Sequence, residues 1–80
     1  MWKLIKECHQ QLTLHSRVRE KVDDSFLIYE IIEVEPDQYK LALVKRGEEA
    51  VTEKIHNVLS CDQLSLYHFE VEEPVPAQTH

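Results

Sequence analysis

Residues 25–45 read SFLIYEIIEVEPDQYKLALVK, two largely apolar runs separated by the polar turn EPDQ. This pattern is typical of a β-hairpin with Pro36 and Asp37 in the turn. The first run is apolar on both faces of the predicted strand. At a period of two, Phe26, Ile28, Ile32 and Val34 share one face, and Leu27, Tyr29 and Ile31 share the other. Such a strand must be covered on both faces, so we expect the hairpin at the centre of the fold.

Upstream of the hairpin, residues 1–12 have the spacing of an amphipathic helix. Apolar side chains occupy one half of the helical wheel, and Trp2, Ile5 and Leu12 form its apolar stripe. Amphipathic helices of small proteins usually turn such a stripe toward their own core. The pattern therefore predicts an N-terminal helix that covers one face of the sheet.

The period changes to two over residues 12–22, which predicts the first strand. Val18 and Val22 lie on one face of this strand. The other face carries a basic row of His15, Arg17, Arg19 and Lys21. Asp23 and Asp24 follow and suit a turn into the hairpin.

Residues 50–60 fit two structures. Apolar residues at i, i+4, i+7 and i+8 from Val51 form a narrow helical stripe, whereas a strand would place Glu53 and Asn57 in the core. We therefore predict a short helix here. A last strand is predicted over residues 63–71, where alternation resumes.

The chain of 80 residues has room for one domain. The predicted class is α+β over residues 1–73, with the N-terminal amphipathic helix packed on a small antiparallel sheet of about four strands and a short second helix. Residues 74–80 are expected to form a disordered C-terminal tail. If residues 50–60 were a strand, the same chain would read as a five-stranded SH3-like or OB-like barrel with an N-terminal helix.

Composition narrows the class of partner and the compartment. The net charge of −6 disfavours nonspecific binding to nucleic acid or to anionic membranes. Two cysteines cannot form a dense disulfide framework. Lys3 and Lys6 interrupt the N-terminal apolar residues too early for a signal peptide, and no apolar run is long enough to span a membrane. We expect a cytoplasmic protein that does not enter a membrane.

The basic row is the strongest candidate for a binding surface. Side chains at i and i+2 of a strand share a face and lie about 6.5–7 Å apart, which suits contact with phosphates or with an acidic protein. The competing interpretation is a solvated strand face whose charges pair with Glu30 or Glu33 on the next strand. We predict a binding site formed by Arg17, Arg19, Lys21, Tyr29 and Tyr67.

Catalytic and metal-binding patterns are weak. The five histidines and two cysteines show neither C-x2-C nor H-x3-H spacing. No serine lies in a G-x-S-x-G context, and the nearest approach to a nucleophilic site is Cys61 flanked by His56 and Asp62. A chain this short has difficulty forming a ligand-sized cleft. We therefore predict no enzymatic activity, no metal, no cofactor and no small-molecule substrate.

These observations favour a small protein-interaction module that binds another protein or itself. An exposed edge strand or the N-terminal helix could support a homodimer. Two alternatives stay open. One is a nucleic-acid-binding small barrel that uses the face of His15, Arg17, Arg19 and Lys21. The other is an acidic inhibitor that mimics DNA, which requires the carboxylates to cluster on one face.

Overall fold

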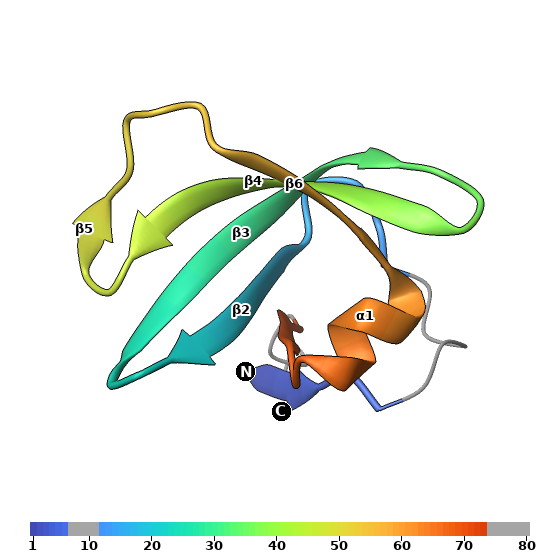
Figure 1. The fold of residues 1–80 in the computed structure, drawn as a ribbon, viewed down its shortest axis with the longest axis horizontal. Coiled ribbons are helices and arrows are strands. Elements are labelled where there is room, and N and C mark those ends of the chain that lie inside the picture. The colour runs from blue at the N-terminus through green and yellow to red at the C-terminus, as the bar shows by residue number, and fades with distance from the viewer. Residues whose placement is uncertain (7–11, 74–80) are drawn as a thin grey trace, which may run out of the picture.

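A computed structural model describes residues 1–6 and 12–73 (Figure 1). In these residues the chain forms a twisted antiparallel sheet and one short helix. The elements are β1 (Trp2–Leu4), β2 (Arg17–Val22), β3 (Ser25–Val34), β4 (Gln38–Arg46), β5 (Glu49–Ala50), β6 (His56–Ser60), α1 (Cys61–Leu66) and β7 (Glu70–Glu72). The strand order is β1-β7-β2-β3-β4-β5, and β6 also pairs with β4.

The hairpin predicted at residues 25–45 is confirmed as β3 and β4, the central pair of the sheet. β3 pairs with β2 along its first half and with β4 along nearly all of its length. Two irregularities shift the β3–β4 register, between Ile28 and Tyr29 and between Ile31 and Glu33. A bulge moves the following residues to the other face. Val34 therefore lies opposite the buried Tyr39 and does not share the face of Phe26.

One apolar cluster on a single side of the sheet forms the core. Val18, Tyr29 and Leu41, from β2, β3 and β4, point into it, and Leu64 of α1 packs there with no exposed surface. The buried members are Ile5, Leu12, Val18, Tyr29, Ile31, Tyr39, Leu41, Leu43, Cys61, Leu64, Phe69 and Val71. We call the opposite side of the sheet the outer face.

The prediction of a helix over residues 1–12 is wrong. Trp2–Leu4 form β1, which pairs with β7, and the Ile5 amide donates to the Phe69 carbonyl at 2.9 Å. A helix this short is marginal alone, whereas the edge of an existing sheet supplies backbone partners at once. Cys8 and His9, in the middle of the predicted helix, lie outside the described residues.

The prediction of a helix over residues 50–60 is also wrong, because His56–Ser60 form β6. The sequence pattern disfavours a strand because strict alternation would bury two polar side chains. Glu53 lies in the loop before β6, and both Glu53 and Asn57 are exposed. The strand therefore buries neither polar side chain.

The predicted last strand, residues 63–71, is right only at its end. Cys61–Leu66 are helical, and the strand begins at Glu70. A capping box explains the helix: the Gln63 amide donates to the Ser60 side chain at 3.2 Å, and the Ser60 amide donates to the Gln63 side chain at 2.9 Å. The fold is thus mostly strand and is not a helix packed on a sheet.

The alternative prediction is a small barrel with an N-terminal helix, but the sheet of the described residues does not close into a barrel. Among residues 1–6 and 12–73, no pairing joins β1 at one end of the sheet to β5 or β6 at the other. Within the same residues, no helix is long and apolar enough to cross a membrane.

Substitutions at two adjacent apolar residues test the strand at the N-terminus. Ile5 is 1% exposed and Leu4 is 40% exposed, although a helix would place both on its apolar side. We expect Ile5→Ala to lower the free energy of unfolding by about 2–5 kcal/mol, since it opens a cavity in the core. Leu4→Ala, the matched control, should change it little. Urea denaturation measures both, and equal losses would contradict the assignment of β1.

Candidate protein-binding face

The basic row of β2 lies on the outer face of the sheet. Val18 is fully buried on the core side, so Arg17, Arg19 and Lys21 point the other way, as the period of two predicts. His15 precedes β2, and its Nδ1 lies 3.2 Å from a carboxylate oxygen of Glu30. The row thus exists, but its members have different surroundings.

Arg19 is enclosed by side chains from three other strands. Its Nε donates to Oε1 of Glu70 at 3.0 Å. Its guanidinium carbon lies 4.5 Å from the centroid of the Trp2 ring and 4.1 Å from that of Phe26. Cation–π contacts of this kind favour the charged group between the two rings. Arg19 therefore links β1 and β7 to the central strands and is not a freely available cation.

Two lysines flank the apolar pair on the outer face of β3. The strand registers place Lys21 opposite Phe26 and Lys45 opposite Ile28. Both lysines are exposed, and neither forms an ion pair within the described part of the chain. Phe26 and Ile28 stay partly exposed between them. We call Arg19, Lys21, Phe26, Ile28 and Lys45 the outer-face patch.

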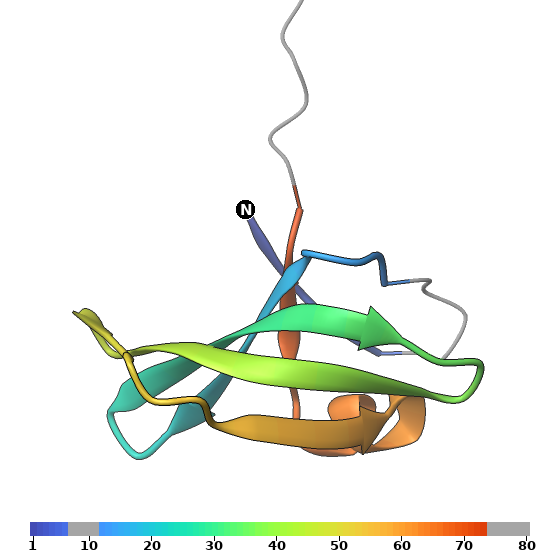
Figure 2. The same cartoon turned by 90° about the horizontal axis from the view of Figure 1, so that it is seen from above.

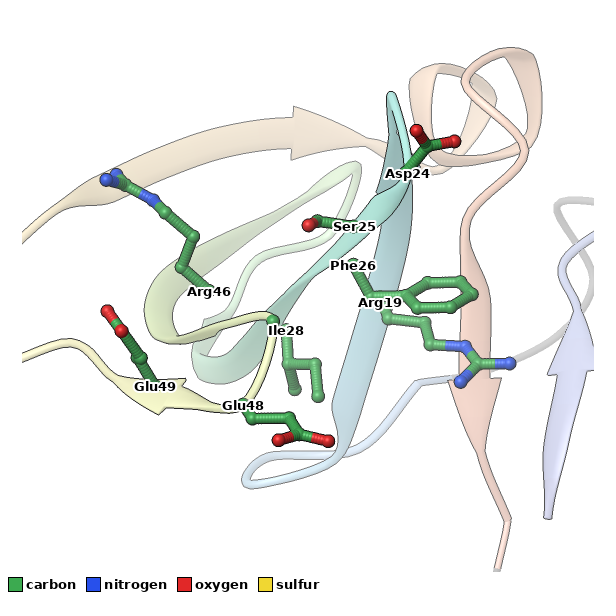
Figure 3. Close-up of a pocket in the computed structure, with 9 residues that line it drawn as sticks. Arg19, Asp24, Ser25, Phe26, Ile28, Arg46, Glu48 and Glu49 are labelled. Carbon is green, nitrogen blue, oxygen red and sulfur yellow. The ribbon is translucent and has the colours of Figure 1, made fainter.

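An open depression of about 600 Å³ adjoins this patch (Figure 3). Arg19, Phe26 and Ile28 line its β-sheet side. Its rim comes from the β2–β3 and β4–β5 connections and the strand ends beside them, and comprises Asp24, Ser25, Arg46, Gly47, Glu48 and Glu49. The depression therefore combines apolar surface with charges of both signs.

The turn after β4 shapes one side of this depression. Gly47 has a φ of 63°, a conformation that glycine adopts without strain, and its amide donates to the Phe26 carbonyl at 2.7 Å. Figure 3 shows the Glu48 side chain extending toward Ile28, while Arg46 and Glu49 project away from it. The turn is thus fastened to the same strand that carries the apolar pair.

The two predicted aromatic residues lie apart from the basic row. Tyr29 is 5% exposed on the core side, and its ring centroid is 5.9 Å from that of Phe69. Tyr67 is 46% exposed and caps the C-terminal end of α1. The aromatic side chains that do contact the row are Trp2 and Phe26. Sequence reasoning missed both as partners of Arg19, although Phe26 lies on the outer face that the period of two predicts.

The candidate metal and nucleophile residues are also dispersed. In residues 1–6 and 12–73, no group of three or more His, Cys, Asp or Glu side chains could hold a metal ion. Cys61 is buried at the start of α1, whereas His56 and Asp62 are exposed. The structure therefore does not gather these three residues into a shared exposed site.

Comparison with known proteins does not assign a family. No protein-family model, curated protein or solved structure matches the chain. The candidate site therefore depends on the geometry of this chain alone.

Replacing Arg19 tests its role as a link between strands. Arg19→Lys keeps the charge but removes the planar group that contacts both rings and Glu70. We expect it to lower the free energy of unfolding by about 1–2 kcal/mol. Arg17→Lys, on the same strand face, should have little effect. Urea unfolding followed by the fluorescence of Trp2, the sole tryptophan, measures both, and equal effects would contradict this role.

Tyr29 makes the free energy of unfolding depend on pH in the alkaline range. Burial raises the pKa of Tyr29 above its usual value of 10.0, and the charge of Glu20 adds to this, while a hydrogen bond from Asn57 and the charge of Arg46 oppose it. The pKa of Tyr29 is therefore higher in the folded than in the unfolded state. The contribution of the protonated Tyr29 to the free energy of unfolding is complete below pH 10 and is lost as the pH rises through the folded pKa.

Tyr29→Phe should therefore make the free energy of unfolding fall less steeply with pH above about 10 than it does in the unchanged protein. Tyr67→Phe is the matched control, because that hydroxyl belongs to an exposed residue. Urea denaturation at a series of pH values from neutral to above 10 gives the slopes. Identical slopes for the unchanged protein and Tyr29→Phe would exclude the effect.

Proposed function

We propose that this protein is a non-enzymatic interaction module that binds an acidic, partly apolar segment of another protein on the outer-face patch. The observation that carries the proposal is the position of Phe26 and Ile28, partly exposed between two lysines without ion pairs in the described part of the chain. An apolar centre with charged neighbours is the usual arrangement of a protein-binding surface.

The chemistry of the patch defines the segment that would fit. An apolar or aromatic side chain of the partner would cover Phe26 and Ile28 and enter the adjoining depression. Carboxylates beside it would lie within reach of Lys21 and Lys45. The apolar contact supplies most of the affinity, and the exposed lysines supply orientation and selectivity.

A nucleic-acid ligand is less well supported by the same surface. Glu70 pairs with Arg19, and Glu30 lies directly opposite Arg17, so two of the three cations on β2 have a carboxylate beside them. Asp24, Glu48 and Glu49 line the adjoining depression. A polyphosphate would meet these carboxylates as well as the net charge of −6.

Selection from a random-peptide display library tests the proposal with a defined probe. We expect enriched peptides to combine Asp or Glu with Leu, Phe or Trp. The double variant Lys21→Glu/Lys45→Glu should weaken the binding of a selected synthetic peptide at least about tenfold, a loss of about 1.4 kcal/mol. Fluorescence anisotropy of the labelled peptide measures the dissociation constants.

A matched double variant, Lys3→Glu/Lys6→Glu, makes the same change in net charge elsewhere and should leave peptide binding nearly unchanged. Labelled duplex DNA and single-stranded RNA are titrated in parallel at low and moderate salt. The proposal fails if the two double variants bind the selected peptide equally. It also fails if the nucleic acids bind more tightly than the peptides, with the steep salt dependence of phosphate contacts.

A further inference from the structure

The strand β6 has one edge without a partner among the described strands. It pairs with β4 on its other edge, from Ala42 opposite His56 to Gln38 opposite Ser60. Figure 2 shows β6 on the outside of the sheet beside β4. An open strand edge presents backbone donors and acceptors to a further strand.

The direction of these backbone groups follows from the ladder. The Leu43 amide donates to the Ile55 carbonyl at 2.9 Å, so this pair is hydrogen-bonded. Hydrogen-bonded and non-hydrogen-bonded pairs alternate in an antiparallel ladder. His56, Val58 and Ser60 therefore turn their amide and carbonyl groups away from β4. Of these, the Ser60 amide already donates to the Gln63 side chain.

The side chains along this edge lack the features that block pairing. β1, at the other end of the sheet, is three residues long and carries Lys3. β6 has no charged residue over its five positions, and its central Val58 is 49% exposed. Short length and charged side chains are the common means of protecting an edge strand. The β6 edge has neither a charge nor so short a length.

We propose that a second copy of this chain pairs antiparallel with β6 across a two-fold axis at Val58. Val58 then exchanges two hydrogen bonds with Val58 of the second copy. His56 of each copy lies opposite Ser60 of the other, where the His56 amide shares the Ser60 carbonyl with the first turn of α1. The occupied Ser60 amide is not needed. The interface is isologous, so one short edge supplies both halves.

Charge complementarity at the ends of β6 argues for a second copy as the occupant. Antiparallel pairing about Val58 places the start of β6 in one copy beside the end of β6 in the other. Lys54 lies in the loop just before β6, and Asp62 lies in the first turn of α1 just after it; both are exposed. Neither forms an ion pair within the described residues. The antiparallel direction therefore brings the end of β6 that carries Lys54 in one copy beside the end that carries Asp62 in the other.

This interface does not depend on the proposed function of the outer-face patch. The two-fold axis is perpendicular to the sheet, so both copies turn their outer faces to the same side. Two outer-face patches would then lie on one continuous sheet. A divalent arrangement strengthens binding to a partner that carries two acidic segments.

Sedimentation velocity of the full chain tests the dimer, over protein concentrations from about 10 μM to about 1 mM, as expected for a small interface. Val58→Lys places two like charges on the axis and should shift the dissociation constant at least about tenfold toward monomer. Leu66→Lys, a matched change at a 69% exposed residue of α1, should leave the dimer unchanged.

A charge exchange keeps the test independent of any effect of Val58→Lys on folding. Lys54→Asp alone and Asp62→Lys alone should each weaken self-association, because each places like charges together at both ends. An equimolar mixture of the two single variants should form a heterodimer, because both ends then pair opposite charges.

Three results would overturn the proposal. One is a chain that stays monomeric throughout the concentration range. Another is a dimer that persists with Val58→Lys. The third is a mixture of the two charge variants that associates no better than either alone. The outer-face variant Lys21→Glu/Lys45→Glu should remain dimeric, so failure of peptide binding and failure of the dimer are separate outcomes.

Discussion

The ten-residue strand β3 has apolar side chains on both faces, and the rest of the fold follows from how each face is covered. On the core side, Tyr29 and Ile31 pack among residues from β2, β4, α1 and β7. The outer face receives no second layer of helix or sheet among the described residues. There, Phe26 is covered by the guanidinium of Arg19. This cover is incomplete, and the apolar surface left beside it makes the outer face the best candidate for binding.

The elements held by local sequence could be predicted, and those held by distant partners could not. The hairpin, the β2 alternation and the turn at Asp23 and Asp24 depend on neighbours in the chain. All are present, although β2 begins at Arg17 and residues 12–16 of the predicted strand are not part of it. β1 depends on β7, about 70 residues away, and a three-residue strand has too few positions to display a period. The short helix α1 did have a local signal, the spacing of Ser60 and Gln63 in a capping box.

The candidate site shows the same division. That Arg17, Arg19 and Lys21 share a face follows from the period of two alone. The period of two does not show which of these cations is available to a partner. Glu70 and Trp2 reach Arg19 only because β7 and β1 pair with the rest of the sheet. The bulge at Ile32 of β3 causes a second departure, since it moves Val34 away from the face that a strict alternation gives. Register and long-range pairing are the information that the linear pattern lacks.

The net charge and the local charge of this molecule act over different distances. An excess of six negative charges sets the field felt by a partner far away, but salt screens it beyond a Debye length of about 8 Å at physiological ionic strength. Within that distance a partner on the outer face meets Lys21 and Lys45 beside Phe26 and Ile28, together with the acidic rim of the depression. An acidic segment can therefore bind an acidic protein, provided that apolar contact supplies the affinity and the lysines only orient it. The same distinction between net and local charge applies at β6. Both copies are negatively charged overall, but the β6 edge carries no charge, so two copies can approach there. Lys54 and Asp62 then need to act only at contact distance.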